Sequence, residues 1–487
     1  MFRPGFHFSV PSNWMNDPNG LVYYEGKYHL FYQHHPYSTD WGTMHWGHAA
    51  SDDLVHWEDK PIALFPDEHG TIFSGSCVVD WHNSSGFFAE GTHGLVAIFT
   101  HNDTYPGSGQ PRQRQSLAYS SDKGETWSFY SGNPVLSEPT LIDFRDPKVF
   151  WHSPSSHWVM VLAAGDRIQL YRSENLRDWK LASEFGAGEG SHRGVWECPD
   201  LFELPVDDGE RTKWVLIVSV GGDQDCPEGS HTQYFIGEFD GIRFVNDYSP
   251  EHVLRLDQGR DHYAGVTYSD IPDADGRRIL IGWMTNLRYA GNTPTGTWRG
   301  AMTLPRVLTL VTVEGEIVLK QSPVHELMQL RNGAANWNDI TVSAEVPLEV
   351  DTETELLELE IEMDISSDQE LQVKVQSSQA CETIIGYDPG SQRLFIDRTH
   401  SGHIDVHPDF AIKHNAPLAP KNGKIKLQLW VDRSAVEVYA NDGIVVMTDL
   451  IFPISPVNRL WIGTNAGPVL LTSLKLHTLE SLRDADS

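Results

Sequence analysis

Three short acidic motifs in the N-terminal half of the chain hold side chains that are able to do chemistry. They are Trp14–Gly20 (WMNDPNG), Asp143–Lys148 (DFRDPK) and Val195–Asp200 (VWECPD). Hydrolysis of a glycosidic bond needs a proton donor for the leaving oxygen and a second carboxylate that meets an oxocarbenium-like centre. Carboxylates from these motifs, if a fold brings them to one pocket, predict a glycosidase.

Each motif also has an ordinary structural explanation. The Asp-Pro-Asn-Gly run at 17–20 is a near-ideal turn, because proline fixes φ and glycine accepts a positive φ. Arg145 and an aspartate of the same motif fit a structural ion pair ahead of a strand. Glu197 lies between a tryptophan and a cysteine, where little water reaches it, as a general acid requires; alternatively, it pairs with Arg193. The motifs are therefore informative only in combination.

The elements that must position these side chains are strands, because short alternating runs bounded by Gly, Pro, Asn and Asp dominate the chain. Leu21–Tyr24, a Glu25-Gly26 turn and Lys27–Tyr32 predict a β-hairpin. Trp158–Ala164 and Trp214–Ser219 predict buried inner strands.

A degenerate repeat organises the N-terminal two thirds. Ser51–Trp57, Ser121–Trp127, Ser173–Trp179 and Glu238–Phe244 are each a polar turn closed by an aromatic residue and flanked by predicted strands. Copies that recur every 50 to 70 residues, roughly, fit one four-stranded blade each, which predicts a β-propeller. Four copies are readable, and a fifth blade is inferred from the remaining length. Such a fold brings the starts of its inner strands to one axial pocket.

The C-terminal third has a different pattern. In Leu357–Ile365 and Ile425–Leu429, apolar residues alternate with charged or polar ones, which indicates strands with one buried face and predicts a β-sandwich. The fold class is thus predicted to be all-β, a five-bladed β-propeller followed by a C-terminal β-sandwich. The predicted boundaries are the propeller at 1–322, a linker at 323–338 with a helix at Val324–Leu330, and the sandwich at 339–487.

Composition excludes several functions. A net charge of −31 argues against nucleic acid and anionic membranes as partners. No apolar run approaches the ~20 residues that span a bilayer. Sixteen Trp, sixteen Tyr and twenty Phe suit a sugar-binding cleft, although β proteins are rich in aromatics anyway. The N-terminus does not resemble a signal peptide, so we expect a secreted protein whose leader is absent, or else a cytoplasmic one.

No metal or cofactor is predicted. The four cysteines show no CxxC pair and no zinc spacing, and the 23 histidines form no HExxH pattern. Oxocarbenium chemistry needs only carboxylates.

Taken together, the chain resembles glycoside hydrolase family 32, which includes invertases, inulinases and levanases. The three acidic motifs carry the match, together with Phe73–Ser76 (FSGS), Gly282–Met284 (GWM) and Asp432–Tyr439 (DRSAVEVY). The resemblance runs over essentially the whole length, and the likeness is to bacterial levanase-type enzymes.

The resemblance implies a role for each carboxylate. Asp17 is the nucleophile, Glu197 the acid and then the base, and Asp146 a stabiliser of the transition state that binds fructose hydroxyls. A double displacement of this kind retains the anomeric configuration and predicts carboxyl groups about 5–5.5 Å apart. Further residues match positions that bind the sugar: Asn16, Gln33, Trp41, Phe73, Ser74, Arg145, Asp261, Trp283 and Trp298.

Three segments depart from the family pattern and leave the acceptor open. They are Asp261–Ala264 (DHYA, where the family usually has DFYA), Thr295–Gly300, and the loop Gly221–Pro227. We expect all three beside the position of a second sugar. The leading hypothesis is exo-hydrolysis of β-2,6 or β-2,1 fructans or fructo-oligosaccharides. The alternatives are a levan fructotransferase that releases a cyclic difructose dianhydride, and an invertase that hydrolyses sucrose.

Two further hypotheses concern the rest of the molecule. A sugar-binding propeller that lost catalysis belongs to a different functional class, and the presence of all three carboxylates argues against it. The sandwich is expected to support the propeller, or to contact polysaccharide or a second subunit in a homodimer.

Overall fold

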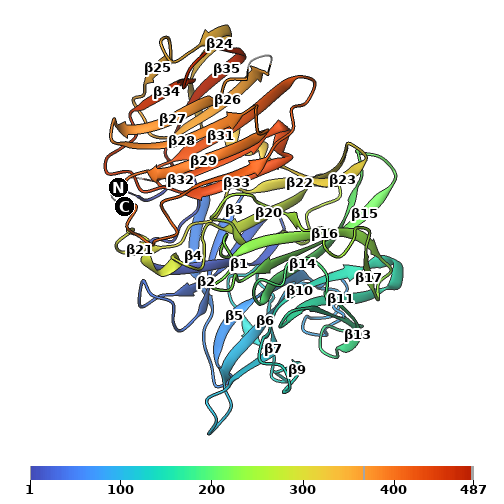
Figure 1. Cartoon of the computed structure of the whole chain (residues 1–487). Helices are drawn as coiled ribbons and strands as arrows, with labels where there is room; N and C mark the ends of the chain where they lie inside the picture. The colour runs from blue at the N-terminus through green and yellow to red at the C-terminus, as the bar shows by residue number, and fades with distance from the viewer. Residues whose placement is uncertain (1, 366–367, 484–487) are drawn as a thin grey trace.

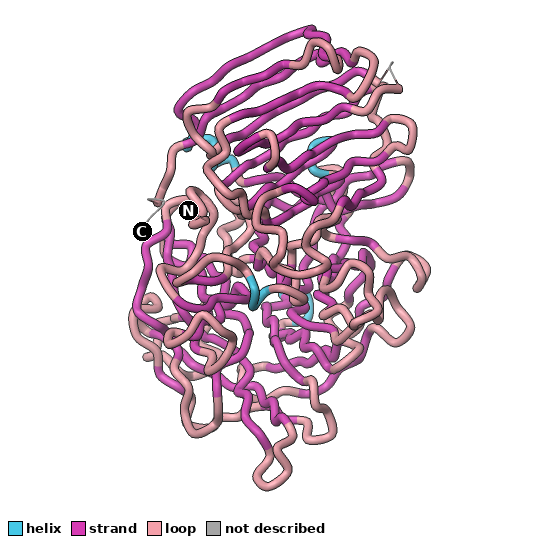
Figure 2. Tube along the Cα trace, turned by 60° about the vertical axis from the view of Figure 1, so that its left-hand side comes forward, coloured by secondary structure: helices cyan, strands magenta, loops and turns pink. Residues whose placement is uncertain are grey.

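The computed structural model describes residues 2–365 and 368–483, and strands make up most of them. Five sheets form one body, and two larger sheets packed face to face form a second body above it (Figure 1). Figure 2 shows that the helical segments are short turns between strands. This architecture confirms the predicted propeller followed by a sandwich.

The propeller has five blades. The first holds β1 (Asn13–Tyr24), β2 (Lys27–His35), β3 (His45–Ser51), β4 (Trp57–Leu64) and, beside β1, β21 (Trp298–Arg299). The second holds β5 (Thr71–Val79), β6 (Leu95–Thr104), β7 (Pro111–Ser120), β8 (Ser128–Phe129) and β9 (Leu136–Ser137). The third holds β10 (Phe144–His152), β11 (His157–Ala164), β12 (Ile168–Ser173) and β13 (Lys180–Phe185), with η1 (Ser153–Ser155) between β10 and β11.

The remaining two blades complete the ring. The fourth holds β14 (Trp196–Pro205), β15 (Thr212–Val220), β16 (His231–Phe239), β17 (Phe244–Asn246) and β18 (Leu254–Arg255). The fifth holds β19 (Tyr263–Thr267), β20 (Arg278–Trp283), β22 (Arg306–Val313) and β23 (Glu316–Pro323), with η2 (Ala290–Asn292) after β20. The five innermost strands contact one another in the cyclic order β1, β5, β10, β14, β19 and back to β1, so the ring closes around one axis.

The predicted hairpin and repeat are both present in the propeller. The hairpin is the pair β1 and β2, and the four repeat copies are the turns that lead into β4, β8, β13 and β17. In three copies the closing tryptophan donates its indole N–H to a carbonyl of the same turn, at 2.8–3.1 Å. The fifth blade lacks the copy because β22 and β23 are joined by a tight Glu314-Gly315 turn with positive φ at both residues.

The two strands predicted as buried inner strands are the second strands of their blades. Trp158–Ala164 and Trp214–Ser219 lie in β11 and β15, the second strands of their blades. They are apolar on both faces because neighbouring blades cover both sides, which gives the same sequence pattern as an axial strand.

The sandwich consists of two six-stranded sheets. In order, one holds β24 (Arg331–Val342), β35 (Val469–Leu479), β26 (Leu357–Asp364), β31 (Lys424–Asp432), β32 (Ala435–Ala440) and β33 (Val445–Leu450). The other holds β25 (Leu348–Asp351), β34 (Arg459–Thr464), β27 (Leu371–Ser378), β28 (Cys381–Asp388), β29 (Arg393–His400) and β30 (Lys413–Pro417). Between β32 and β33 lies η4 (Asn441–Gly443). The segment 323–338, expected to be a linker, contains η3 (His325–Leu330) and the start of β24.

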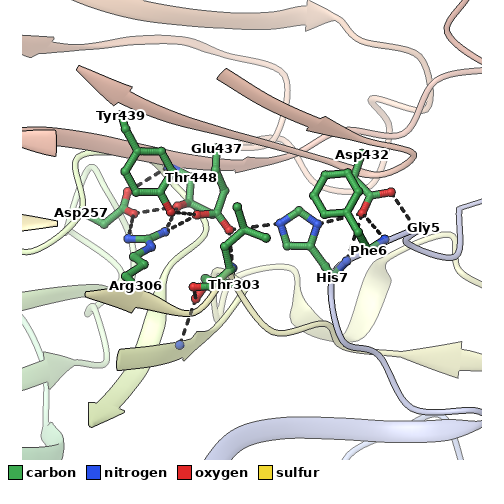
Figure 3. Close-up of polar contacts among 12 residues, drawn as sticks. Gly5, Phe6, His7, Asp257, Thr303, Arg306, Asp432, Glu437, Tyr439 and Thr448 are labelled. Carbon is green, nitrogen blue, oxygen red and sulfur yellow. Dashed lines mark hydrogen bonds and ion pairs between the residues drawn. The ribbon is translucent and has the colours of Figure 1, made fainter. Parts of the chain in front are cut away.

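A buried polar network joins the two bodies (Figure 3). Arg306 on β22 donates to Asp257 Oδ2 at 2.9 Å and to Glu437 Oε2 on β32 at 2.7 Å. His7 lies 3.1 Å from the other oxygen of Glu437 and 2.8 Å from Asp432 Oδ2 at the end of β31. Their side chains are almost fully excluded from solvent, so each charge depends on its partners.

The first residues of the chain are part of this junction. The backbone N–H groups of Gly5, Phe6 and His7 all donate to the Asp432 carboxylate, at 2.6–3.2 Å. The Leu482 N–H donates to the Gly5 carbonyl at 2.8 Å, so the first and last parts of the described chain lie side by side (Figure 1). The N-terminal segment is thus held between the propeller and the sandwich.

The junction predicts a pH-dependent stability through His7. Burial alone would lower the pKa of this imidazole, but hydrogen bonds to Asp432 and Glu437 raise it to about 9. Because the folded-state pKa is raised, the stabilisation is complete below pH 6.5 or so and is lost as pH rises through 9. We expect the free energy of unfolding to fall by about 3 kcal/mol over that window through this group.

Denaturant titrations of the native chain and of His7→Gln across this pH range measure the effect. The difference between the two curves should shrink as pH rises. His56→Gln, at an imidazole that is 56% exposed, is the matched control and should follow the native curve. Parallel curves for the native chain and His7→Gln would contradict the prediction.

Candidate active site

The inner strand of every blade carries a β-bulge at the same level. On each, two residues lie opposite a single residue of the neighbouring strand. The bulged pairs are Asn16-Asp17, Phe73-Ser74, Asp146-Pro147, Cys198-Pro199 and Ala264-Gly265. A bulge breaks the alternation of side chains and re-aims them. Five bulges in a ring therefore turn neighbouring residues toward one end of the propeller axis.

The local sequences suit these bulges. Asp146, Cys198 and Ala264 have φ values of 64°, 46° and 53°, so the backbone turns sharply there. The proline that follows Asp146 and Cys198 has no N–H to leave unpaired in the disrupted ladder. The Asp-Pro-Asn-Gly run is likewise part of strand β1 and not a free turn.

Each freed amide at these three bulges finds a partner on the preceding blade. Asp146 N–H donates to Thr100 Oγ1 at 3.1 Å, and Ala264 N–H donates to Ser219 Oγ at 3.0 Å. Cys198 N–H donates to Asp146 Oδ2 at 3.0 Å. Hydrogen bonds between blades thus fix the position along the propeller axis at which the site residues meet.

Asp17 lies among donors at the end of the axis. Ser74 Oγ donates to its Oδ2 at 2.6 Å, and Asn16 Nδ2 donates to its Oδ1 at 3.1 Å. Burial raises the pKa of the Asp17 carboxyl, the Ser74 hydrogen bond opposes this rise, and the Glu197 carboxylate adds to it. The donors orient the carboxylate and favour its ionised form.

Asp146 shares a thiol neighbour with Asp17. The Cys198 sulfur lies 3.6 Å from Oδ2 of both carboxylates, which places the two acids on either side of one small side chain. Burial raises the pKa of Asp146 to about 7, against the opposing effect of the Arg145 guanidinium 4.0 Å away. The sequence did not single out Cys198, although it stands inside the third motif.

Glu197 is held from both sides. Arg145 donates to its Oε1 through Nε at 3.1 Å and through Nη2 at 2.9 Å, and Tyr263 donates to its Oε2. Arg145 also donates to Asp143 Oδ1 at 2.5 Å and lies 4.0 Å from Asp146 Oδ2, so the Arg–Asp pair expected in the second motif is present. The arginine partner of Glu197 is Arg145 and not Arg193. Arg145 therefore links the second and third motifs through Glu197.

Amides and rings surround the carboxylates. The Asn16 side-chain oxygen accepts from Trp14 Nε1 at 2.7 Å, and Gln33 donates to Asn19 at 2.8 Å. The Trp41 ring is 57% exposed and meets Phe73 edge to face, with centroids 6.0 Å apart. These groups form a rim with both an apolar face and hydrogen-bonding groups.

Two predicted sugar-binding tryptophans are buried. Trp283 packs edge to face on Trp14, and its indole Nε1 has no hydrogen-bond partner among the described residues. Trp298 is 5% exposed, and the Arg3 guanidinium lies over its ring at 4.9 Å. Trp298 therefore packs behind the rim.

The prediction that Asp261 binds sugar is wrong for this conformation. Its carboxylate accepts from Tyr289 at 2.6 Å, from Arg398 of the sandwich at 2.5 Å and from the Leu450 N–H at 2.8 Å. The side chain is fully buried, so it joins the two bodies and cannot reach a ligand. Its neighbour Tyr263, which the sequence analysis passed over, is the residue of this motif that reaches the site.

The three atypical segments lie in different places. His262 is 2% exposed and Trp298 is buried, so the first two segments do not line the pocket at these positions. The loop Gly221–Pro227 does lie beside the site, because a Cβ on Gly221 would be 3.7 Å from Glu197 Oε2. Of the three atypical segments, this loop is therefore the one placed to contact the molecule that accepts the fructosyl unit.

Two structural findings concern other kinds of site. Among the described residues, no cluster of three or more His, Cys, Asp or Glu side chains has an arrangement that holds a metal ion. Within the same part of the chain, no helix is long and apolar enough to cross a membrane.

Comparisons with known proteins agree with this architecture. Residues 7–323 match the model for the glycosyl hydrolases family 32 N-terminal domain, and residues 326–478 match the family 32 C-terminal model. The chain is 49% identical over 486 residues to a levanase of Bacillus subtilis, covering 99% of this chain and 71% of that protein. It is 39% identical to an extracellular exo-inulinase of Aspergillus awamori, covering 96% and 92% of the two chains. The crystal structure of an exo-inulinase from Aspergillus awamori superposes with a TM-score of 0.90, at 37% identity and 99% coverage of both chains.

The placement of Asp261 predicts a loss of stability in Asp261→Asn. The change removes the nearer of the two buried counterions of Arg398 and leaves only Asp449, 3.4 Å away. Breaking a buried ion pair typically costs about 3–5 kcal/mol. Urea unfolding measures the effect. Asp351→Asn is the matched control, since that carboxylate is 93% exposed and 4.0 Å from Arg459, and should change stability by less than about 1 kcal/mol. If Asp261→Asn were as stable as the native chain, the structural role of the Asp261 carboxylate would be contradicted.

Proposed function

This chain belongs to glycosyl hydrolase family 32, and from that premise we propose that it releases fructose from the non-reducing ends of fructans of the levan and inulin types. The names of its relatives, levanase and exo-inulinase, support this substrate class. The observation that carries the proposal is the convergence of Asp17, Asp146 and Glu197 at one end of the propeller axis.

In the first step, Asp17 attacks the anomeric carbon of the terminal fructosyl unit while Glu197 protonates the glycosidic oxygen. The bond to the rest of the polymer breaks, and the fructosyl unit becomes an ester of Asp17. The hydrogen bonds from Ser74 and Asn16 suit this role because they orient the carboxylate before attack.

In the second step, Glu197 accepts a proton from water, and the water oxygen attacks the same carbon. Fructose leaves with its configuration retained, and the Asp17 carboxylate is restored. Arg145 and Tyr263 hold the two oxygens of Glu197, so the group that changes protonation twice keeps one orientation.

The remaining site residues are proposed to bind the sugar. Asp146 accepts hydrogen bonds from fructose hydroxyls and offsets the positive charge that develops in the transition state. Asn16 and Gln33 bind hydroxyls, and the exposed Trp41 ring beside Phe73 covers the C–H surface of the sugar. Trp283 offers its unpartnered indole N–H, and Trp298 supports the rim from behind. Because one relative is named as extracellular, we also propose that the chain acts outside the cell.

Product analysis tests the reaction. Incubation with levan and with inulin should release free fructose, and NMR of the first turnovers should show the β-anomer. A cyclic difructose dianhydride as the product would replace hydrolysis by intramolecular transfer. An initial α-anomer would exclude the double displacement.

Substitution of the proposed nucleophile tests the mechanism on the same substrates. Asp17→Asn should lower kcat by about 10⁴-fold or more, because no ester can form. Asp388→Asn on the sandwich, a carboxylate far from the axis along β28, is the matched control and should keep native activity. Native turnover by Asp17→Asn would reject Asp17 as the nucleophile.

The Ser74 hydrogen bond predicts a shift in pH dependence. Ser74→Ala removes a donor that lowers the pKa of Asp17, so the pKa of this carboxyl rises further. Since the nucleophile must be ionised, the acidic limb of the kcat/KM profile should move to higher pH. Ser76→Ala is the matched control, because that hydroxyl accepts from the Val149 N–H at 3.0 Å and touches no catalytic carboxylate. An unmoved acidic limb in Ser74→Ala would contradict the role of this bond.

A further inference from the structure

The propeller has a large cavity at the end of its axis opposite the three carboxylates. It measures 880 Å³ and is lined where the inner strands end, with residues from all five blades. On β10, Asp146 lies at the catalytic end, and Trp151 lies at this cavity five residues later. At about 3.3 Å per residue, the two ends of the axis lie roughly 17 Å apart.

A buried ion pair separates the cavity from the catalytic pocket. The Lys148 ammonium donates to the Thr267 carbonyl and lies 3.5 Å from Asp200 Oδ2. Asp200 Oδ2 also accepts from the Thr267 N–H at 2.6 Å and from its hydroxyl at 2.8 Å. These contacts tie the third, fourth and fifth blades together across the axis, so the cavity is a site of its own.

Exposed indole rings form the walls of this cavity. Trp81 is 49% exposed and Trp151 is 38% exposed, which is unusual for such large apolar side chains. Both rings are fixed: Trp81 Nε1 donates to Asp270 Oδ1 at 2.9 Å, and Trp151 meets Trp158 edge to face at 5.3 Å. Rigid aromatic surfaces lose little conformational freedom when a ligand covers them.

The polar groups of the cavity favour a neutral ligand that is rich in hydroxyls. The Asp200 carboxylate at the cavity floor is fully buried, so the acceptors open to a ligand are the exposed carboxylates at the cavity edge. Glu25, Glu203 and Asp273 at the cavity edge add negative charge, which disfavours anions. Flat rings combined with isolated acceptors match the C–H faces and hydroxyls of a carbohydrate.

We propose that this cavity is a second, non-catalytic carbohydrate site that binds an oligosaccharide stretch of the fructan polymer. The identity of the ligand rests on the proposed function. A site on the opposite mouth of the propeller holds the enzyme on the polymer while another chain end occupies the catalytic pocket. Binding at this second site raises the effective concentration of polymer chain ends near the catalytic pocket. The gain therefore applies to polymers and not to short substrates.

A binding titration in a chain that does not turn over tests the site directly. In the Glu197→Gln background, calorimetry with an inulin-type oligosaccharide should resolve two sites per chain. Adding Trp81→Ala and Trp151→Ala should remove one site, or weaken it by about tenfold or more. One site in the Glu197→Gln parent, or two unchanged sites in the triple variant, would overturn the proposal.

Kinetics of the active enzyme provide the second readout. Trp81→Ala/Trp151→Ala should raise KM for polymeric levan severalfold and leave kcat/KM for a trisaccharide unchanged. Trp461→Ala, at a partly exposed tryptophan on β34 of the sandwich, is the matched control and should alter neither. If the double variant fails to fold, Trp81→Ala alone carries the test, because half of that ring is already exposed.

The two proposals fail in distinguishable ways. Two binding sites without fructose release would reject the proposed hydrolysis and keep the cavity as a carbohydrate site. Fructose release with a single binding site would reject the cavity proposal alone.

Discussion

The active site depends on one repeated backbone distortion, the bulge at the start of each inner strand. A regular strand points successive side chains to opposite faces, so neighbouring residues cannot both reach the axis. The bulge at Asn16-Asp17 breaks this alternation, as does the one at Asp146-Pro147. Because the Cys198 amide at the next bulge donates to Asp146, the distortions of adjacent blades also support one another. Backbone geometry, more than any single side-chain contact, gathers the acids.

The sandwich acts on the site through the strand that carries Tyr263. Asp261, two residues earlier, is anchored by Arg398 of the sandwich and by the Leu450 amide. Tyr263 in turn donates to Glu197. The sandwich thus anchors the chain two residues from Tyr263, which hydrogen-bonds the group proposed to move protons. The same contacts therefore support both the propeller and the site.

The sequence predicts local chemistry well and long-range pairing poorly. The outer turns were readable because an Asx residue and a closing tryptophan form them without help from the rest of the chain, as at Asp53 and Trp57. The family resemblance located the carboxylates, and the structure brings them together. The family resemblance misplaced Asp261, because its partner Arg398 is 137 residues away and no local sequence pattern reveals that ion pair. The bulges were also hidden, since Asp-Pro-Asn-Gly looks like a turn when its neighbouring strands are unknown.

The hydrogen bonds between residues 5–7 and Asp432 constrain the order in which parts of the chain fold during synthesis. His7 and its partner are 425 residues apart, so the ribosome makes nearly the whole chain before the contact can form. The segment around His7 leaves the exit tunnel well before Asp432 does and reaches its final place only afterwards. Until then Phe6 and Phe8, both buried in the finished molecule, are open to solvent and to chaperones. The segment that the Asp432 carboxylate anchors is therefore one that a growing chain must protect for a long time.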